Sequence, residues 1–258
     1  MKLVLAELRK LSYSKSTLGL TLASSFVAVL STVVTPIVIA DDQSGLFGSL
    51  KDQAMVDSVY ANAVSSYIFA TILGILIMSG EFRHGTAVAT FLASPKRERV
   101  LGAKLFIAAI AGALMQLISL VLAVAAGWYT LTLFEDVADP SDDVFLNLSI
   151  AAMLSGAVLA ILGVAIGSLI RNQLIAIVST LLWLFIVEPI ILLLFVDAGK
   201  WLPTGAITGM LAIKFESAAI GVDTSDYLSS GVATLVLLAY GAIFSLVALV
   251  TSMRRDIE

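Results

Sequence analysis

The chain has 258 residues, of which 59% are hydrophobic and 13% are charged, and it contains no cysteine. A soluble domain carries about 25% charged residues, so the composition leaves no room for a large soluble domain and favours a membrane protein. The lack of cysteine excludes disulfide bonds and thiolate metal sites. The net charge of −4 says little as a total, but its distribution is informative.

The first 16 residues are basic and carry an apolar helical face. Val4, Leu8 and Leu11 recur at helical spacing, which predicts an interfacial helix lying on the cytoplasmic leaflet. The alternative is the start of a signal peptide, since residues 38–40 resemble a cleavage site. The apolar run that follows far exceeds the apolar core of a signal peptide, which has about 7–15 residues, so we favour an uncleaved first span.

Long apolar runs predict an all-α membrane protein with six transmembrane helices in a single domain over residues 1–258. A run of about 20 apolar residues is enough to cross the hydrocarbon core as a helix. The predicted spans are residues 17–40, 58–80, 105–131, 148–170, 174–196 and 231–253. In the fourth span, Gly163 and Gly167 form a small-xxx-small face that lets another helix approach closely. The alternative is that these glycines face lipid.

The charges divide between the two sides of this topology. Of the 15 Lys and Arg, 12 fall on the side of the termini and 3 on the other side. The acids run the opposite way, with five of them (Glu135, Asp136, Asp139, Asp142 and Asp143) in one short loop after the third span. Basic residues near span ends stay in the cytoplasm, so we expect both termini to be cytoplasmic.

A basic segment, residues 81–104, connects the second and third spans. Its middle, residues 85–92, is uncharged and is interpreted as a short, weakly apolar surface helix that another protein could grip. Glu81 is interpreted either as a brace or docking contact for this helix or as a solvated end charge. Lys96, Arg97 and Arg99 are predicted to anchor lipid headgroups. Ser94 followed by Pro95 predicts the start of the next helix.

Glu188 is the one acid predicted within a span, and Pro189 follows it. A carboxylate inside a membrane is costly, and proline breaks or kinks a helix, so the pair is a candidate gate or hinge. The alternative is a polar contact that holds the fifth span to a neighbour. Residues 197–230 are mixed in character and predict one or two short helices that dip into the outer leaflet.

Motifs of catalysis are missing from the sequence. His84 is the only histidine, which argues against multi-histidine metal sites and a Ser-His-Asp triad. The phosphate-binding pattern GxxxxGK[ST] does not occur either. We therefore expect no enzyme activity and no cofactor in this chain. If ATP drives the protein, another chain must bind it.

Three stretches together resemble the permease subunits of bacterial ABC type-2 transporters. The first is Glu7-Leu8-Arg9-Lys10 at the end of the basic leading helix. The second and most specific is Glu81-Phe82-Arg83-His84-Gly85-Thr86, followed by Ala93-Ser94-Pro95-Lys96-Arg97. The third is Trp201-Leu202-Pro203 after the fifth span. The likeness covers nearly the whole chain.

The resemblance implies a half-transporter in the bacterial plasma membrane, most commonly an exporter. The segment between the second and third spans would be the coupling helix, so Glu81, Phe82, Arg83, His84, Gly85 and Thr86 would dock a separate ATPase subunit. That partner would bind ATP and Mg, and a second permease copy or homologue would complete the unit; membrane lipids surround it, and no nucleic acid is expected. The alternatives are an ion- or proton-coupled secondary carrier that uses Glu188, a membrane-embedded enzyme, and a non-transporting scaffold or sensor.

Overall fold

A computed structural model of the chain describes residues 2–42, 48–83, 85–86, 97–170, 172–211, 216–217, 222–223 and 228–251. Six helical stretches in these ranges are long and apolar enough to cross a membrane. They are Lys15–Asp41, Gln53–Arg83, Arg97–Leu131, Val144–Leu169, Gln173–Ile191 and Ser230–Val250. Each overlaps one predicted span, so the prediction of a helical protein with six segments long and apolar enough to cross a membrane is confirmed.

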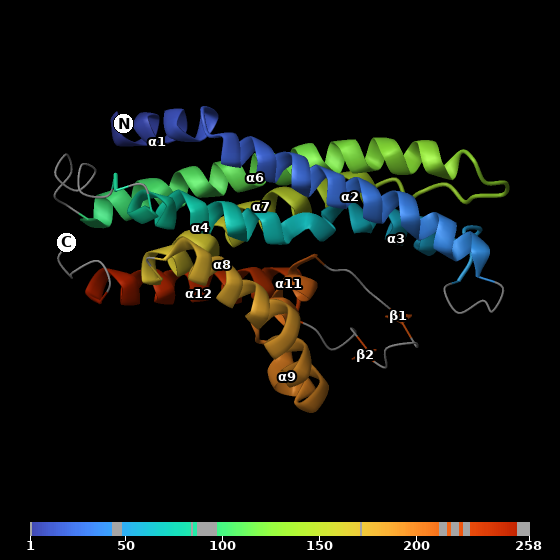
Figure 1. Cartoon of the computed structure of the whole chain (residues 1–258). Helices are drawn as coiled ribbons and strands as arrows, with labels where there is room; N and C mark the ends of the chain where they lie inside the picture. The colour runs from blue at the N-terminus through green and yellow to red at the C-terminus, as the bar shows by residue number, and fades with distance from the viewer. Residues whose placement is uncertain are drawn as a thin grey trace.

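The long helices form an elongated bundle (Figure 1). In chain order the elements are α1 (Lys2–Ser12), α2 (Lys15–Asp41), α3 (Gln53–Ala61), the 3-10 helix η1 (Asn62–Tyr67), α4 (Ile68–Arg83), α6 (Arg97–Leu131), α7 (Val144–Leu169), α8 (Gln173–Leu182), the π-helix η2 (Trp183–Val187), α9 (Glu188–Leu194), α10 (Val196–Gly199), α11 (Pro203–Leu211), the two-residue strands β1 (Glu216–Ser217) and β2 (Val222–Asp223), and α12 (Ser230–Val250). The two strands pair in antiparallel fashion. All other described elements are helical.

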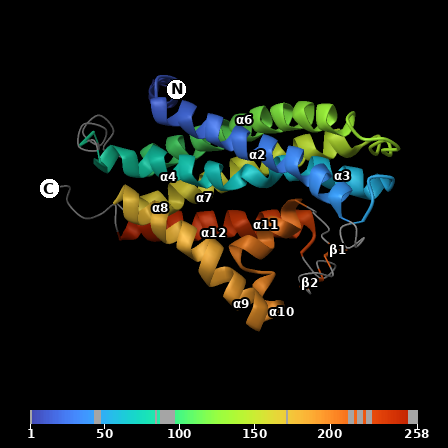
Figure 2. The same cartoon turned by 45° about the vertical axis from the view of Figure 1, so that its right-hand side comes forward.

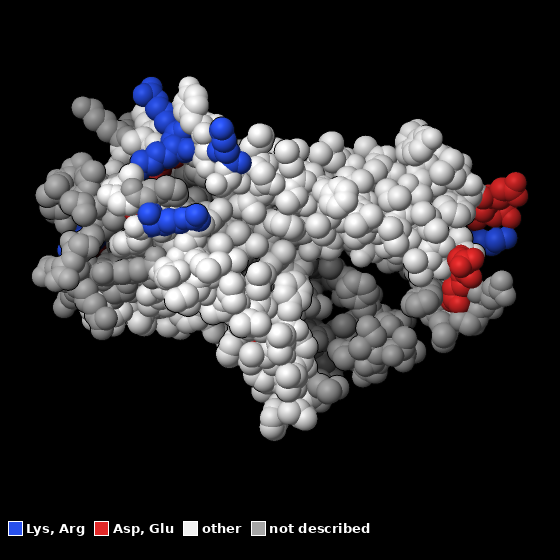
Figure 3. All heavy atoms as spheres, in the orientation of Figure 1, with Lys and Arg blue, Asp and Glu red and all other residues white. Residues whose placement is uncertain are grey.

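The two ends of the bundle carry opposite charge (Figure 3). At the end formed by α1, the last turn of α4 and the first turn of α6, exposed bases include Arg9, Lys10, Lys15 and Arg83. At the opposite end, the acids of the loop between α6 and α7 are exposed. We call these the basic end and the acidic end. The charge division expected from the sequence therefore follows the long axis of the molecule.

Some predicted boundaries are shifted. Within the described residues the third span begins at Arg97 rather than at residue 105, and the resulting α6 has 35 residues. At about 1.5 Å per residue, it is about 50 Å long and exceeds a hydrocarbon core of about 30 Å. Residues 97–104 of the predicted basic segment are thus the first part of α6. The fifth span ends at Leu194, and Phe195 leaves helical geometry before α10.

The centre of the bundle is α7, which packs against α4, α6 and α12. Glycines let these helices approach closely. A Cβ placed on Gly163 would lie 2.1 Å from the carbonyl oxygen of Thr71 in α4, and one on Gly167 would lie 2.9 Å from that of Ile75. The glycines of the fourth span therefore face α4, as their spacing predicted, and not lipid.

Polar side chains break the regularity of the second span. Within η1, Ser66 donates to Oε1 of Gln116 in α6 at 3.0 Å and accepts from Ser24 of α2 at 3.0 Å. Ser65 and Ser31 form a second hydroxyl contact to α2 at 3.0 Å. Hydrogen bonds between helices compensate for polar groups that cannot reach water inside a membrane, which accounts for a serine-rich 3-10 stretch in this span.

The fifth span packs against α4 through α8 and projects from the bundle at α9 (Figure 2). From the basic end, α8 and α9 leave the other helices obliquely, while α11 returns to pack against α12. Asn172 starts this span, because its side chain accepts hydrogen bonds from the backbone of Leu174 and Ile175 at 3.0 and 3.1 Å. Much of the surface of α8 and α9 is apolar and exposed.

We expect Gly163→Ala to lower the midpoint of thermal unfolding in detergent. The added methyl group collides with backbone, so α4 and α7 must separate, at a cost of about 1–3 kcal/mol. The matched control is Gly19→Ala in α2, where a Cβ meets no atom within 4 Å. That variant should be neutral or more stable, because alanine favours a helix by up to about 1 kcal/mol over glycine. Equal midpoints for the two variants would contradict the close contact.

Candidate functional site

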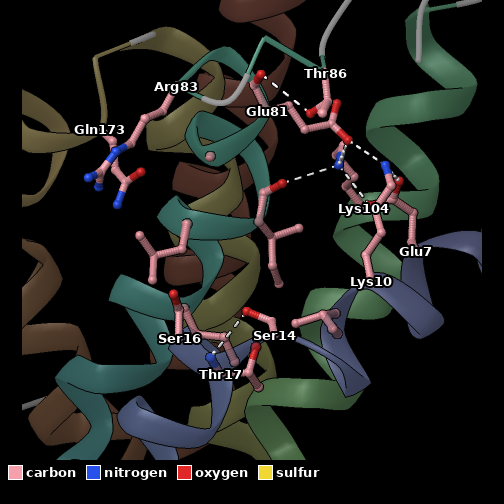
Figure 4. Close-up of a pocket in the computed structure, with 15 residues that line it drawn as sticks. Glu7, Lys10, Ser14, Ser16, Thr17, Glu81, Arg83, Thr86, Lys104 and Gln173 are labelled. Carbon is pink, nitrogen blue, oxygen red and sulfur yellow. Dashed lines mark hydrogen bonds and ion pairs between the residues drawn. The ribbon is translucent and has the colours of Figure 1, made fainter. Parts of the chain in front are cut away.

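Four charged side chains from three helices meet at the basic end (Figure 4). Glu7 and Lys10 come from α1, Glu81 from the last turn of α4, and Lys104 from α6. We call them the charge cluster. They lie beside the point where the chain leaves α4, so the cluster is positioned at the start of the predicted coupling segment.

Each acid of the charge cluster contacts both bases. Lys10 Nζ donates to Glu7 Oε1 at 2.9 Å and to Glu81 Oε1 at 2.8 Å. Lys104 Nζ donates to Glu7 Oε2 at 2.8 Å, to Glu81 Oε1 at 2.9 Å and to the carbonyl of Ile77 at 3.1 Å. A lysine ammonium has three N–H donors, so Lys104 is fully satisfied. These bonds join α1 to both α4 and α6.

Most of the cluster is removed from solvent. The side chains of Lys104, Glu7 and Glu81 are 1%, 5% and 8% exposed, whereas Lys10 is 50% exposed and forms the outer member. Two acids and two bases leave no net charge. This balance matters because a buried charge without a partner costs several kcal/mol, while a paired and hydrogen-bonded one roughly breaks even.

Ion pairing within the cluster shifts the pKa values of Glu7 and Lys10. Burial acts to raise the pKa of the Glu7 carboxyl, but Lys104 and Lys10 outweigh it and lower this pKa below its ordinary value of 4.5. For Lys10, burial acts to lower the pKa, but hydrogen bonds and attraction from Glu81 and Glu7 raise it overall. Both shifts favour the charged forms of Glu7 and Lys10.

The chain leaves α4 through a glycine-based helix cap. Gly85 has a φ of +67°, its N–H donates to the carbonyl of Phe82 at 3.4 Å, and the N–H of Thr86 donates to that of Glu81 at 3.0 Å. This pair of bonds is the Schellman motif, in which a left-handed glycine closes the helix. Gly85 and Thr86 therefore end α4 at a defined place. A glycine soon after an apolar helical run is the sequence signal for such a stop.

The other predicted docking residues lie in different surroundings. Glu81 is buried and paired, so it is a brace between helices and not a solvated end charge. Phe82 is partly buried against the core, and Arg83 is exposed. His84 and residues 87–96, which include Ser94, Pro95 and Lys96, lie outside the described residues. Of the predicted lipid anchors, Arg97 opens α6 and Arg99 is exposed.

Sequence reasoning did not assign Glu7 and Lys104 to a common site, and it counted Lys104 among the surface bases. Lys104 is instead almost fully buried. Its neighbours three and four positions away in the helix, Val100, Leu101, Ile107 and Ala108, are all apolar, and this pattern indicates a lysine on a buried face. Glu7 likewise lies three residues after Val4 and four before Leu11, on the apolar face of α1.

Glu188 occupies a separate site in the oblique fifth span. It is fully buried and accepts hydrogen bonds from the indole N–H of Trp183 and from the backbone N–H of Thr204 at 2.5 Å. The second bond satisfies a free donor in the first turn of α11. The predicted polar contact to a neighbouring element is therefore present. Glu188 directly follows the π-helix, and Pro189 is the next residue. Proline has no backbone N–H, so it removes one hydrogen bond from the regular helical pattern at this point.

The charge cluster links three helices next to a cavity. In the charge cluster, both lysines bond both glutamates. Within the described residues no group of three His, Cys, Asp or Glu is placed to hold a metal ion. A cavity of about 470 Å³ adjoins the cluster and is bounded by α1, α2, α4 and the start of α8.

We expect Lys104→Gln to reduce the unfolding free energy by about 3–5 kcal/mol, because it leaves two buried carboxylates with a single, half-exposed base. The measurement is thermal or denaturant unfolding in detergent. Lys51→Gln is the matched control. It removes an ion pair of similar length (3.0 Å to Asp136), but both partners are mostly exposed, and such pairs contribute about 0–1 kcal/mol. Similar losses in both variants would contradict a buried cluster.

Acid should weaken the protein partly through Glu7. A carboxyl whose pKa is lower in the folded state stabilises the fold above its ordinary pKa, here 4.5, and this contribution is lost as the pH falls through the folded-state value. We expect the unfolding midpoint of the wild type to fall more steeply below pH 4.5 than that of Glu7→Gln. Glu135→Gln, at the acidic end, should keep the wild-type slope. Parallel curves for all three proteins would refute the assignment.

No protein-family model and no curated protein sequence matches this chain. The structure shows a helical protein with six segments long and apolar enough to cross a membrane and with a charge cluster at its basic end.

Proposed function

We propose that this chain is the permease subunit of an ATP-driven transporter of the ABC type-2 kind, working with a separate ATPase subunit and a second permease copy. The observation that carries the proposal is the charge cluster. It binds α1 to the helices on both sides of residues 84–96, the segment that would dock the ATPase. Any displacement of that segment would be delivered to α1, α4 and α6 together.

Helix packing supports a path from this segment into the bundle. Backbone of α4 contacts α7 at Gly163 and Gly167, and Gly112 of α6 contacts α7 at Gly156, where an added Cβ would lie 2.2 Å from a carbonyl oxygen. Such contacts leave little space for α4 or α6 to shift without α7. In the proposed mechanism, ATP-driven closure of the partner moves these helices as one body and opens a route beside the less tightly packed fifth span.

Charge supports the proposed orientation. The basic end would face the cytoplasm, with both termini and the docking segment on that side, and the acidic loop would face outward. This places the docking segment where an ATPase and its ATP and Mg are available. We propose that the transporter lies in the plasma membrane of a bacterial cell and exports its substrate.

A secondary carrier that uses Glu188 remains the competing proposal. Both carboxylate oxygens of Glu188 accept hydrogen bonds, one from Trp183 and one from the first turn of α11. A proton relay needs a further acceptor to pass the proton on, and Glu188 is the one acid of the predicted spans. The geometry thus favours a role in holding α9 to α11. The carrier proposal predicts gradient-driven transport that Glu188→Gln abolishes.

We expect an ATPase with a phosphate-binding GxxxxGK[ST] motif to co-purify with this chain from its native membrane in mild detergent. Phe91→Ala, in the middle of the proposed docking segment, should reduce the amount recovered several-fold. It is a better probe than Glu81, whose loss would disturb the charge cluster. Phe106→Ala is the matched control, because Phe106 is 58% exposed on α6 and lies outside the proposed docking segment in the sequence.

Two results would contradict the proposal. One is a pure complex that contains no ATPase, which would direct attention to gradient-driven transport and Glu188. The other is recovery of the same amount of ATPase with the Phe91 variant as with the Phe106 variant. In that case the chain would still associate with an ATPase, but residues 84–96 would not be the docking segment.

A further inference from the structure

The cavity beside the charge cluster has a charged rim and an apolar wall. It measures about 470 Å³ and is bounded by the turn between α1 and α2, by α4 and by the start of α8 (Figure 4). Lys10 and Arg83 line the rim together with hydroxyl groups of the α1–α2 turn, while Leu73, Leu76 and Ile77 line the wall formed by α4. Leu73 lies ten residues before Arg83, about 15 Å deeper along the helix.

The rim carries a positive charge that the cluster does not neutralise. Lys10 and Lys104 are balanced by Glu7 and Glu81. Arg83 also borders the cavity, and in the part of the chain that the structure describes it takes part in no ion pair or side-chain hydrogen bond. A guanidinium presents a planar fork of donors that matches phosphate oxygens. In Figure 4 the Arg83 side chain lies near Gln173, on the other side of the view from the half-exposed Lys10.

We propose that this cavity binds an anionic phospholipid. The phosphate contacts Arg83 at the rim, and the first part of an acyl chain lies along Leu73, Leu76 and Ile77. Basic pockets between membrane helices on the cytoplasmic side are suited to anionic headgroups. A free phosphate ion shares the charge but makes no use of the apolar wall. The proposal is independent of any ATPase partner.

The wall can be tested without a change of charge. Gly80 lines the cavity, and a Cβ placed on it meets no atom within 4 Å. Gly80→Leu therefore fills the cavity from an α4 position that has room for a side chain. Gly102→Leu is the matched control, because Gly102 in α6 has equally open surroundings and does not line the cavity.

The experiment is native mass spectrometry of the purified, delipidated full chain with phosphatidylglycerol, and separately with phosphatidylcholine. We expect one tightly retained phosphatidylglycerol and several-fold less phosphatidylcholine. Arg83→Gln and Gly80→Leu should each lower phosphatidylglycerol retention several-fold. Arg9→Gln and Gly102→Leu should retain the wild-type amount, since Arg9 is an exposed base of α1 that does not line the cavity.

Three outcomes would overturn the proposal. Equal retention of the two lipids would remove the role of charge. Unchanged phosphatidylglycerol retention in both Arg83→Gln and Gly80→Leu would place the lipid elsewhere. Displacement of the lipid by millimolar inorganic phosphate, with the same thermal stabilisation by phosphate alone, would show a site for a free anion.

Discussion

The buried charge cluster is the interaction on which the basic end of this protein depends. Inside a membrane the hydrophobic effect does not favour one helix pairing over another, so close packing and polar contacts decide the arrangement. Glu7, Glu81 and Lys104 are almost removed from solvent, and each is costly without the others. Their hydrogen bonds join α1 to both α4 and α6. The cluster therefore acts as a positional device more than as a source of net stability.

Glycine contacts perform the corresponding task in the interior. At Gly163 and at the Gly112–Gly156 pair, backbone meets backbone, so α4, α6 and α7 fit in one register. The fifth span is held differently. It projects from the bundle, and Glu188 joins its second half to the first turn of α11. Its first half, α8, packs against α4, and the π-helix η2 separates α8 from the projecting α9.

The sequence predicted the spans well because long apolar runs and loop charges are local signals. The same holds for Gly163 and Gly167, whose spacing indicates a packing face. The irregular turns η1 and η2 were not predicted, since they depend on partners in other helices. Glu81 shows this limit most clearly: its bases lie 71 and 23 residues away, and Glu7 and Lys104 are 97 residues apart. Helical periodicity relates residues within a few turns, so it left Glu81 open between a brace and a solvated charge.

The cap of α4 links the charge cluster to the segment that follows this helix. A helix end that frays would absorb a displacement applied just beyond it. Here Gly85 closes α4 with two backbone bonds, and the carbonyl group of Glu81 accepts one of them while its carboxylate joins the cluster. Glu81 therefore takes part both in the cap of α4 and in the contacts with α1 and α6. On the far side of the connecting segment, Lys104 anchors α6 to the same two acids. Residues 84–96 are thus attached at both ends to a single set of charges. A partner that moves this segment would act on three helices at once, which is the property that the proposed coupling to an ATPase requires.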